Sequence, residues 1–486
     1  MAPNTETIVP QLRRDFEALV DYVSGPDSAN HDVYTVELHL FRRLLRIGAA
    51  LLKLFFQTRA ATRPAAPTTP EGGPMRYHGL RSVRYSSIFG ELWVTRHYFT
   101  APHQASEAPL DAALSLPQTA YSDLLREWGA YGDTEQAYRE NQALLERVLG
   151  LTVPVATLEQ QAQASAQDVD AFYAQPHVPL EPTHSGSLLV VQADGKGVPM
   201  RVATPEEPAR LGTHSKRGTK KEAVVTCLYT IAPYVRTAEE VAAAILHEGE
   251  PKQVRPRPKP VGKEQHATLA GKAVACTTLA HRAAQRDGPQ IRHRVALTDG
   301  AEALQDQVQA HFPDFTLVLD IMHANEYLWD AASALLGESE VARKDWLRPQ
   351  LVRVLEGRVS EVIGSLEKAA TAPSCTPGQR KVLERTIGYY RRNQPYMRYD
   401  RYLAQGWPIG TGVVEGACGH LVKDRMEQAG MRWTVEGAQA ILDLRAVRLN
   451  GHWDAYWHFH RQQQHQRLYR TPSTTTPEEK LFRQAA

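Results

Sequence analysis

The sequence predicts an α/β fold in which a mixed sheet carries an all-helical insertion and follows a mostly helical region with a β-hairpin. Short apolar runs that suit buried strands alternate with helical patterns between residues 184 and 324. Helical periodicity is then almost continuous from about 325 to 405. Before residue 184 the pattern is helical except at 76–99, where apolar and polar residues alternate around a turn at Gly90.

The composition is that of a globular protein without extreme charge. The 486 residues suffice for two to four domains, with 42% hydrophobic and 23% charged residues and a net charge of +2. A nucleic acid partner would therefore need positive charge concentrated locally. The four cysteines are far apart in sequence, which argues against a zinc site or a disulfide framework. No apolar run reaches the roughly 18 residues of a membrane span, and the N-terminus lacks a signal-peptide pattern, so we expect a cytoplasmic protein without a membrane partner.

The N-terminal segment, residues 1–60, contains an amphipathic helix at about 32–59. Its apolar residues recur at helical spacing, while its basic residues lie mostly off that stripe. Core packing or a dimer contact explains such a stripe better than membrane docking. Residues 61–75 are rich in Pro, Thr and Gly and are expected to form a linker.

Residues 76–183 are predicted to bind DNA. The hairpin at 76–99 alternates arginines with aromatic residues, which suits either contact with phosphates and bases or a half-solvated sheet. Three helical patterns follow at 122–131, 134–149 and 155–173. Their spacing fits a helix-turn-helix, although any small helical bundle gives the same pattern.

The first candidate site residue is Asp194, which we expect at the end of the apolar strand that begins near Leu188. By the period-two rule Leu188, Val190, Gln192 and Asp194 share one face, so the core-facing positions lead to an acid. A buried carboxylate is costly unless a positive group pairs with it. An Asp-Gly pair after a strand also suits an ordinary hairpin turn. The turn alone does not explain why the same pattern recurs twice later in the chain.

Basic residues follow this strand and are predicted to contact DNA phosphates. They comprise Lys196 and a dense loop of Lys216, Arg217, Lys220 and Lys221. The proline-rich basic segment at 251–263 is predicted to be a mobile loop, and could be a solvated linker or a further phosphate contact.

Two further strands end in acids, Asp299 and Asp320, with a helical pattern between them. Strand–helix–strand units are parallel, and ligands of such sheets bind at the carboxyl ends of the strands. A fourth acid, Glu415, is predicted to begin a helix that runs to about residue 429 and to point inward along an apolar stripe. A glutamate that only caps its helix is the alternative. The stripe is flanked by candidate DNA contacts, namely His420, Lys423 and Arg425.

Clustered carboxylates repel one another unless they hold cations. Carboxylates without accompanying His and Cys sets suit Mg²⁺ or Mn²⁺ rather than zinc. Two such ions can activate an attacking oxygen and stabilise the leaving oxygen of a phosphodiester. We therefore expect two ions, with Asp194 bridging both and Asp299 and Glu415 each holding one.

Several of these segments resemble the ISKra family of bacterial insertion-sequence transposases, which are similar to Mutator-like DDE enzymes. The segments are VVQADGKGVPMR, KRGTKK, PYVRT, LTDG, LVLDIMHANEYLW and GWPIGTGVVEGACGHLVKDRMEQAGMRW, spread over residues 80–460. The resemblance implies an RNase H-like catalytic domain at 184–450 with the helical insertion at about 325–405. It also implies metal-dependent cleavage and strand transfer of double-stranded DNA at terminal inverted repeats, by a homodimer or higher oligomer acting at the nucleoid.

Carried over by position, the resemblance makes Asp194, Asp299 and Glu415 the catalytic acids. Asp320 and His323 match a D-x-x-H signature whose role is to orient the site or the DNA, although Asp320 also ends a strand and competes with Asp299 as second acid. The alternatives are a catalytically quiet DNA-binding descendant and a stand-alone RNase H-like nuclease. The segment at 451–486 is predicted to have an aromatic start and a disordered tail from residue 462.

Overall fold

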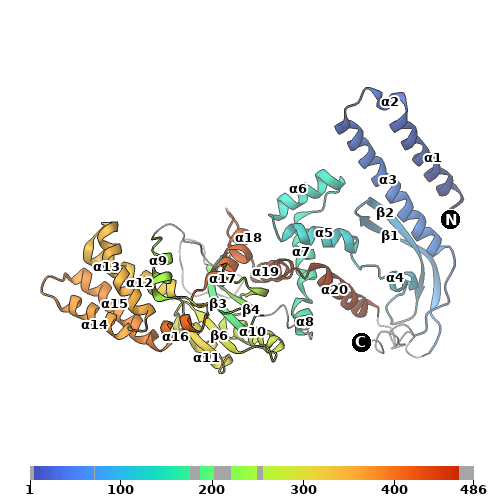
Figure 1. Ribbon diagram of the computed structural model, residues 1–486. Helices are drawn as coiled ribbons and strands as arrows, with labels where there is room; N and C mark the ends of the chain where they lie inside the picture. The colour runs from blue at the N-terminus through green and yellow to red at the C-terminus, as the bar shows by residue number, and fades with distance from the viewer. Residues whose placement is uncertain are drawn as a thin grey trace. The chain divides into compact units, whose positions relative to one another are not determined.

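The chain forms two compact units, which are described separately. Unit 1 comprises residues 1–168 and 453–486, and unit 2 comprises residues 169–452. The computed structural model describes residues 5–69, 72–175, 186–201, 220–248, 256–428 and 430–469 (Figure 1).

Unit 1 begins with a helical hairpin (Figure 1). Its helices are α1 (Thr5–Ser24), α2 (Pro26–Ala29) and α3 (Val33–Ala60). Asp32 starts α3, because its side chain accepts a hydrogen bond from the backbone N–H of Thr35. The Tyr22 hydroxyl of α1 lies 3.0 Å from Nδ1 of His39 on α3, which fixes the two helices against each other. The helix predicted at 32–59 is therefore confirmed.

The predicted β-hairpin is also present, as β1 (Arg76–Ser87) and β2 (Gly90–Thr100). Gly90 has φ +121°, a value that suits glycine at the turn. Phe56 of α3 packs against Leu92 and Val94 of β2, so the helix covers one face of the hairpin.

The rest of unit 1 is helical. Its helices are α4 (Pro109–Ala113), α5 (Asp123–Asp133), α6 (Tyr138–Leu149), α7 (Val155–Ala166) and α20 (Trp453–Leu468). Leu125, Leu145 and Leu158 form the small core of α5, α6 and α7. The prediction that the chain becomes disordered from residue 462 is wrong up to Leu468, because α20 continues to that residue.

Unit 2 contains a five-stranded mixed sheet. In spatial order its strands are β5 (Val261–Thr268), β4 (Lys220–Ile231), β3 (Leu188–Pro199), β6 (His293–Thr298) and β7 (Thr316–Leu319). The β3–β4 and β4–β5 pairs are antiparallel, whereas β3–β6 and β6–β7 are parallel. The parallel half brings the ends of β6 and β7 to the same edge as the distal part of β3.

Two expectations about these strands are corrected. β3 does not end at Asp194 but continues to Pro199, because β4 remains paired with it as far as Lys220. The basic segment at 251–263 is not wholly a loop, because β5 begins at Val261 and pairs with β4.

Helices cover both faces of the sheet. Leu189 and Val191 of β3 point to one face, which is covered by α10 (Lys272–Arg286) and α11 (Glu302–His311). Leu188 and Val190 point to the other face and join a larger core. Alternation along β3 thus fixes the face on which each later residue lies.

The larger core is completed by the predicted helical insertion. Its helices are α12 (Ile321–Leu336), α13 (Glu340–Leu355), α14 (Val359–Thr371), α15 (Pro377–Asn393) and α16 (Tyr399–Ala404). Two shorter helices of unit 2 lie elsewhere in the sequence, α8 (Val169–Ala174) and α9 (Ala238–Ile245).

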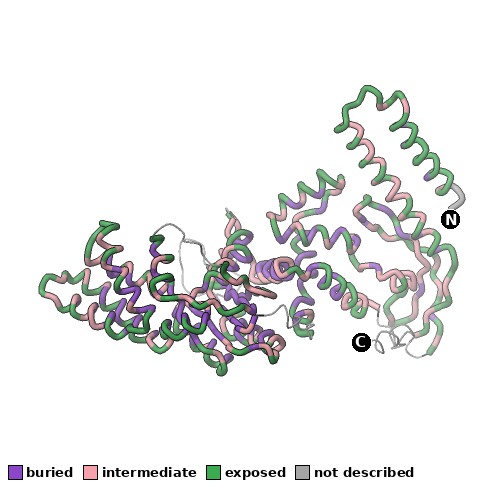
Figure 2. The backbone as a smooth tube through the Cα atoms, viewed as in Figure 1, coloured by how far each residue is buried: buried purple, intermediate pink, exposed green. Residues whose placement is uncertain are grey.

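After the insertion the chain forms a broken helix and a long one. These are α17 (Gly412–Ala417), the π-helical segment η3 (Cys418–Lys423), α18 (Asp424–Met426) and α19 (Val435–Leu449). Figure 2 shows that buried positions run through the sheet and its helices, whereas α1 is largely exposed and α3 is mostly intermediate or exposed. Within the described ranges, the structure has no helix of the length and apolarity that a membrane crossing needs.

Candidate active site

Asp194 lies on the central strand of the sheet, half-buried, with its side chain held by two donors. The backbone N–H of Gly195 donates to Oδ1 at 2.6 Å, and the thiol of Cys418 donates to Oδ2 at 3.4 Å. Burial raises the pKa of Asp194, and the negative charge of Asp299 raises it further. Ionisation of Asp194 in the folded chain therefore costs free energy.

Asp299 follows β6 directly and occupies the matching position beside Asp194. Gln192 of β3 is in register with Leu297 of β6, and each acid lies two residues further along its strand. The backbone N–H of Ala301 donates to Asp299 Oδ1 at 2.9 Å. Parallel pairing thus delivers two carboxylates to neighbouring strands at one edge of the sheet.

Glu415 reaches the same edge from α17, which is anchored to β3 through Gln192. The Gln192 carboxamide accepts a hydrogen bond from the N–H of Val414 at 2.9 Å and donates to the carbonyl of Gly410 at 3.2 Å. Cys418, which donates to Asp194, lies one helical turn after Glu415. The helix that carries Glu415 therefore passes beside Asp194, which it contacts through Cys418.

The expected inward orientation of Glu415 is corrected, because the residue is exposed. Its helix also begins earlier, at Gly412, so Glu415 belongs to the first turn rather than starting it. The hydroxyl of Thr411 donates to Glu415 Oε1 at 2.6 Å and holds the side chain at the site.

Asp320 is fully buried at the start of α12, and both its oxygens are engaged. Oδ1 accepts from the N–H of Thr411 at 3.1 Å. Oδ2 accepts from the backbone N–H of His323 at 3.0 Å and lies 2.6 Å from its Nδ1. Asp320 thus ties β7, α12 and the segment before Glu415 together.

His323 is half-buried, and its hydrogen bond to Asp320 raises its pKa to about 9. The ring is therefore protonated at neutral pH, and its charge also lowers the pKa of Asp194. Among the described residues, Asp320, His323 and Glu415 form a group whose ligand atoms all lie within 4.8 Å of one another.

This compact group differs from the ligand set that the sequence predicts. The group of Asp320, His323 and Glu415 is compact, but Asp320 has no free oxygen and His323 already shares its proton with it. Asp194, Asp299 and Glu415 bring carboxylate oxygens, and the described part of the chain gives none of the three an ion pair with Lys or Arg. This all-oxygen donor set fits Mg²⁺ or Mn²⁺.

Three of the predicted DNA contacts gather around Glu427, near the end of β3 and the start of β4. Lys220 Nζ lies 2.6 Å and Lys196 Nζ 3.9 Å from the Glu427 carboxylate. The hydrogen bond from Lys220, together with the charges of Lys196 and Lys423, lowers the pKa of Glu427. One carboxylate thus faces three ammonium groups, which leaves a local excess of positive charge.

The other predicted contacts behave differently. Lys221 is partly exposed on β4, and His420 is exposed with its Nδ1 3.1 Å from Asp424. Lys216 and Arg217 lie outside the described residues. Arg425 is corrected as a DNA contact, because it is fully buried with its guanidinium 4.8 Å from the ring centroid of Trp433.

Sequence reasoning missed the residues that hold the acids in place. Gln192 shares the strand face with Asp194, and this alternation was the available signal for it. Cys418 gave no such signal, because its contact with Asp194 joins residues that are distant in sequence. The Thr411 hydroxyl contacts Glu415 four residues later, and this local spacing was the available signal for it.

A scan against protein-family models found no match, and a search of curated proteins found none either. Among solved structures, the chain is similar to a chain in a structure described as "Drosophila P element transposase strand transfer complex". The two share 8% sequence identity, the match covers 70% of this chain and 95% of that chain, and the TM-score is 0.31. A TM-score of 0.31 is too low to show that the two chains share a fold.

Proposed function

We propose that this chain is the transposase of an insertion sequence. It binds the terminal inverted repeats of a mobile element and cleaves and joins DNA strands with divalent metal. The observation that supports this most is that Asp194 and Asp299 lie at matching positions of neighbouring strands, while Cys418, one turn after Glu415, donates a hydrogen bond to Asp194.

The sheet supports an RNase H-like catalytic core. Its spatial order is third, second, first, fourth and fifth strand of the domain, with only the second antiparallel to the rest. The first acid lies on the first strand and the second acid after the fourth strand. This is the arrangement that the DDE reading of the sequence requires.

The metal ligands in this proposal are Asp194, Asp299 and Glu415. Two Mg²⁺ or Mn²⁺ ions held there would activate the attacking oxygen and stabilise the leaving oxygen of the phosphodiester. We assign Asp299 rather than Asp320 as the second acid, because both carboxylate oxygens of Asp320 already accept hydrogen bonds within the protein. Asp320 and His323 then position the segment that carries Glu415.

DNA would lie across the edge of the sheet next to these acids. Lys196, Lys220 and Lys423 are close enough to one another to influence the same carboxylate, and they can contact successive phosphates. The exposed Trp93 on the hairpin of unit 1 is a further candidate for nucleic acid contact.

The test is DNA cleavage by the purified full-length chain. The substrate is a DNA fragment that carries the sequences flanking the coding gene, incubated with Mg²⁺ or Mn²⁺. We expect nicked products from the wild type and at least a roughly hundredfold lower rate from Asp194→Asn. Asp306→Asn, which alters an exposed acid on α11, is the matched control and should cleave like the wild type.

Metal binding provides a second readout that does not require activity. A saturating Mn²⁺ concentration should raise the unfolding midpoint of the wild type by about 2–4 °C. Asp194→Asn should show little of this rise, and Asp306→Asn should show all of it. A wild type that binds DNA but neither cleaves it nor responds to metal would contradict the proposal and identify a catalytically quiet DNA-binding protein.

A further inference from the structure

The helical hairpin of α1 and α3 presents large apolar side chains that no described residue of unit 1 covers. On α1 these are Val9, Phe16, Val20 and Val23, between 37% and 56% exposed. On α3 they are Val33, Tyr34, Phe41, Leu44, Leu51 and Phe55, between 41% and 81% exposed. We call these ten residues the hairpin face.

The hairpin face is separate from the stripe by which the two helices pack. Leu12, Leu19 and Tyr22 of α1 are buried against α3, whereas Phe16 and Val20 are about half exposed. At 100° per residue, each exposed stripe lies about a quarter turn ahead of its packing stripe. Because the helices are antiparallel, both exposed stripes turn to the same side of the hairpin.

The exposed positions on α3 follow a heptad repeat. Tyr34, Phe41 and Phe55 occupy one position of the repeat, and Leu44 and Leu51 occupy the position three residues later. This is the spacing by which one helix packs on another along a continuous seam. Such a seam is found buried in helical bundles, and here it faces outward.

Gly48 occupies the central position of this repeat, and its missing side chain is replaced from outside the helix. A Cβ atom at Gly48 would lie 2.5 Å from Cδ1 of Phe89, which sits in the turn between β1 and β2. Phe89 is itself 37% exposed, so its ring extends the hairpin face instead of closing it.

The size of the face fits a protein–protein interface. Ten side chains that are about half exposed offer on the order of 1,000 Å² of mostly apolar surface. The largest patch on a typical monomer is roughly 300–600 Å², and a standard interface buries about 800 Å² per partner.

The charges on the face point to a second copy of the same chain. Two charged residues of α3 lie on the same side of the helix as the hairpin face, Glu37 and Arg59. Glu37 comes eleven residues before Gly48, and Arg59 comes eleven residues after it. Phe41 and Phe55 lie seven residues before and after it. A twofold axis near Gly48 would place each Glu37 opposite an Arg59 and each Phe41 opposite a Phe55.

We propose that two copies of this chain dimerise through the hairpin face, with their α3 helices antiparallel about Gly48. Four helices then bury the ten apolar residues between two layers, and the Phe89 ring of each copy lies between the two α3 helices at Gly48. Arg42, Arg46 and Lys53 lie on the opposite side of α3 and stay in solvent, whereas Arg43 packs over the Tyr22 ring of α1. The inference goes beyond the proposed catalytic function and does not depend on it.

The first test is the molar mass of the full-length protein in solution, measured by light scattering without DNA. We expect a dimer at micromolar concentration. The double variant Leu44→Asp with Leu51→Asp should raise the dissociation constant about a hundredfold or more, because it places unpaired charges in the interface. Val341→Asp, at a residue that is 71% exposed on α13, is the matched control and should remain dimeric.

The second test uses the two charges. Glu37→Arg alone and Arg59→Glu alone should each weaken the dimer roughly tenfold, because each creates two like-charge pairs. The variant carrying both changes should recover wild-type affinity, since opposite charges again face each other. Circular dichroism should show unchanged helix content in all variants, because both residues are exposed.

A monomeric wild type would overturn the proposal, as would a dimer that survives the change at Leu44 and Leu51. Failure of the paired charge reversal to restore affinity would overturn the antiparallel arrangement. A monomer that instead co-sediments with vesicles of phosphatidylglycerol and phosphatidylethanolamine would assign the face to a lipid surface and overturn it as well.

Discussion

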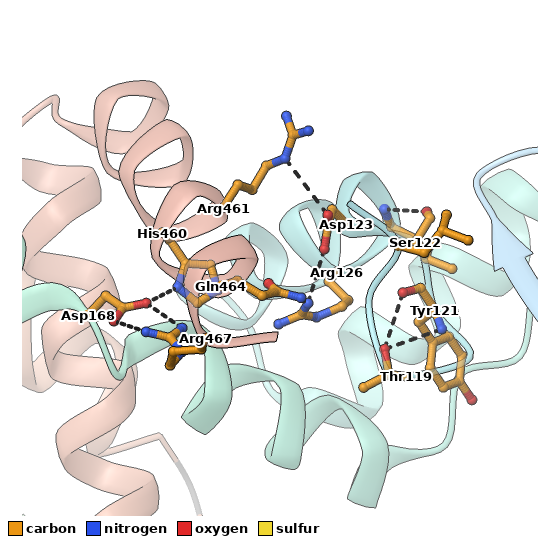
Figure 3. Close-up of polar contacts among 12 residues, drawn as sticks. Thr119, Tyr121, Ser122, Asp123, Arg126, Asp168, His460, Arg461, Gln464 and Arg467 are labelled. Atoms are coloured by element: carbon orange, nitrogen blue, oxygen red, sulfur yellow. Dashed lines mark hydrogen bonds and ion pairs between the residues drawn. The ribbon is translucent and has the colours of Figure 1, made fainter. Parts of the chain in front are cut away.

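A cluster of titratable side chains in unit 1 and another in unit 2 differ in their charge balance. In unit 1, Asp168 lies 2.6 Å from His460 Nδ1 and accepts hydrogen bonds from Arg467 at 2.5 and 2.9 Å (Figure 3). In unit 2, Asp194, Asp299 and Glu415 accept only backbone, hydroxyl or thiol hydrogen bonds in the part of the chain that the structure describes.

The difference appears in the pKa values. Burial alone would raise the pKa of Asp168, but the hydrogen bonds from His460 and Arg467 outweigh burial and lower it. Burial raises the pKa of Asp194, and Asp299 adds to the rise. Direct ion pairs neutralise Asp168 and join helices. The charge of His323 leaves the pKa of Asp194 raised, as suits a carboxylate that binds a cation from outside.

The largest effect that separates the two roles is expected within the acid cluster itself. Asp299→Asn should lower the cleavage rate at least about a hundredfold and leave the free energy of unfolding nearly unchanged, because the residue is only half-buried. Asp320→Asn should lower both, since Asp320 is buried and holds three donors. Rates from single-turnover assays and urea unfolding of the same preparations would check this. If both variants lost the same activity and kept the same stability, Asp299 as a metal ligand could no longer be distinguished from Asp320 as a positioning residue.

Substitution of Asp168 should lower the free energy of unfolding and leave the DNA cleavage rate of the folded protein unchanged. Asp168→Asn removes the partner of a buried histidine and of Arg467, and should lower the free energy of unfolding by roughly 2–3 kcal/mol. Asp170→Asn, two residues away and exposed, should change it by less than about 0.5 kcal/mol. Urea unfolding monitored by circular dichroism measures both. A stable Asp168→Asn variant with a lost cleavage activity would show that this cluster is a functional site after all.

A smaller effect is expected at the link between Asp320 and Glu415. Thr411→Val keeps the backbone N–H that Asp320 binds but removes the hydroxyl that holds Glu415. We expect a cleavage rate about tenfold lower and a higher Mn²⁺ concentration for half-maximal activity, because Glu415 is less well positioned. Thr411→Ser keeps the hydroxyl and should restore both values. Metal titrations of the three proteins would decide, and an unchanged metal requirement in Thr411→Val would contradict the positioning role.

Much of this architecture could be predicted from sequence because its signals are local. Apolar runs followed by Asp194, Asp299 and Asp320 identify strands that lead to one edge of a sheet, and helical periodicity marks the insertion. The strand β5 was missed because buried charge makes it resemble a loop. Its Glu264 is neutralised by Arg282 and Arg286 of α10, which only the folded chain brings together.

The same limit explains the errors near the site. Gly195 and Gly197 indicate a turn locally, but pairing with β4 carries β3 past them. Arg425 lies in a basic helical segment and suggests a surface, but Trp433 from a later turn of the chain covers it. In each case a contact between distant segments decides the outcome, and no local pattern records it.

The smallest expected effect is a change in the pH dependence of stability. It measures the charge imbalance directly, because the same Asp→Asn substitution is compared at Asp194 and at Asp168. Because the pKa of Asp194 is raised on folding, the folded chain binds more protons than the unfolded chain from the ordinary value of 3.8 upward. The free energy of unfolding therefore falls as pH rises through the folded pKa, and at neutral pH the carboxylate carries a stability cost. Asp194→Asn should remove that cost and raise the unfolding midpoint by about 1–2 °C at pH 7 in EDTA.

Asp168 should behave in the opposite way, because its pKa is lowered on folding. Its contribution to stability is present above 3.8 and is lost as pH falls through the folded value. The stability difference between Asp168→Asn and the wild type should thus shrink toward acid pH. Urea unfolding from pH 3 to pH 8 without metal would record both trends. If Asp194→Asn proved less stable than the wild type at pH 7, a partner within the protein would already neutralise that carboxylate. The proposal that the acid cluster binds an external cation would then be wrong.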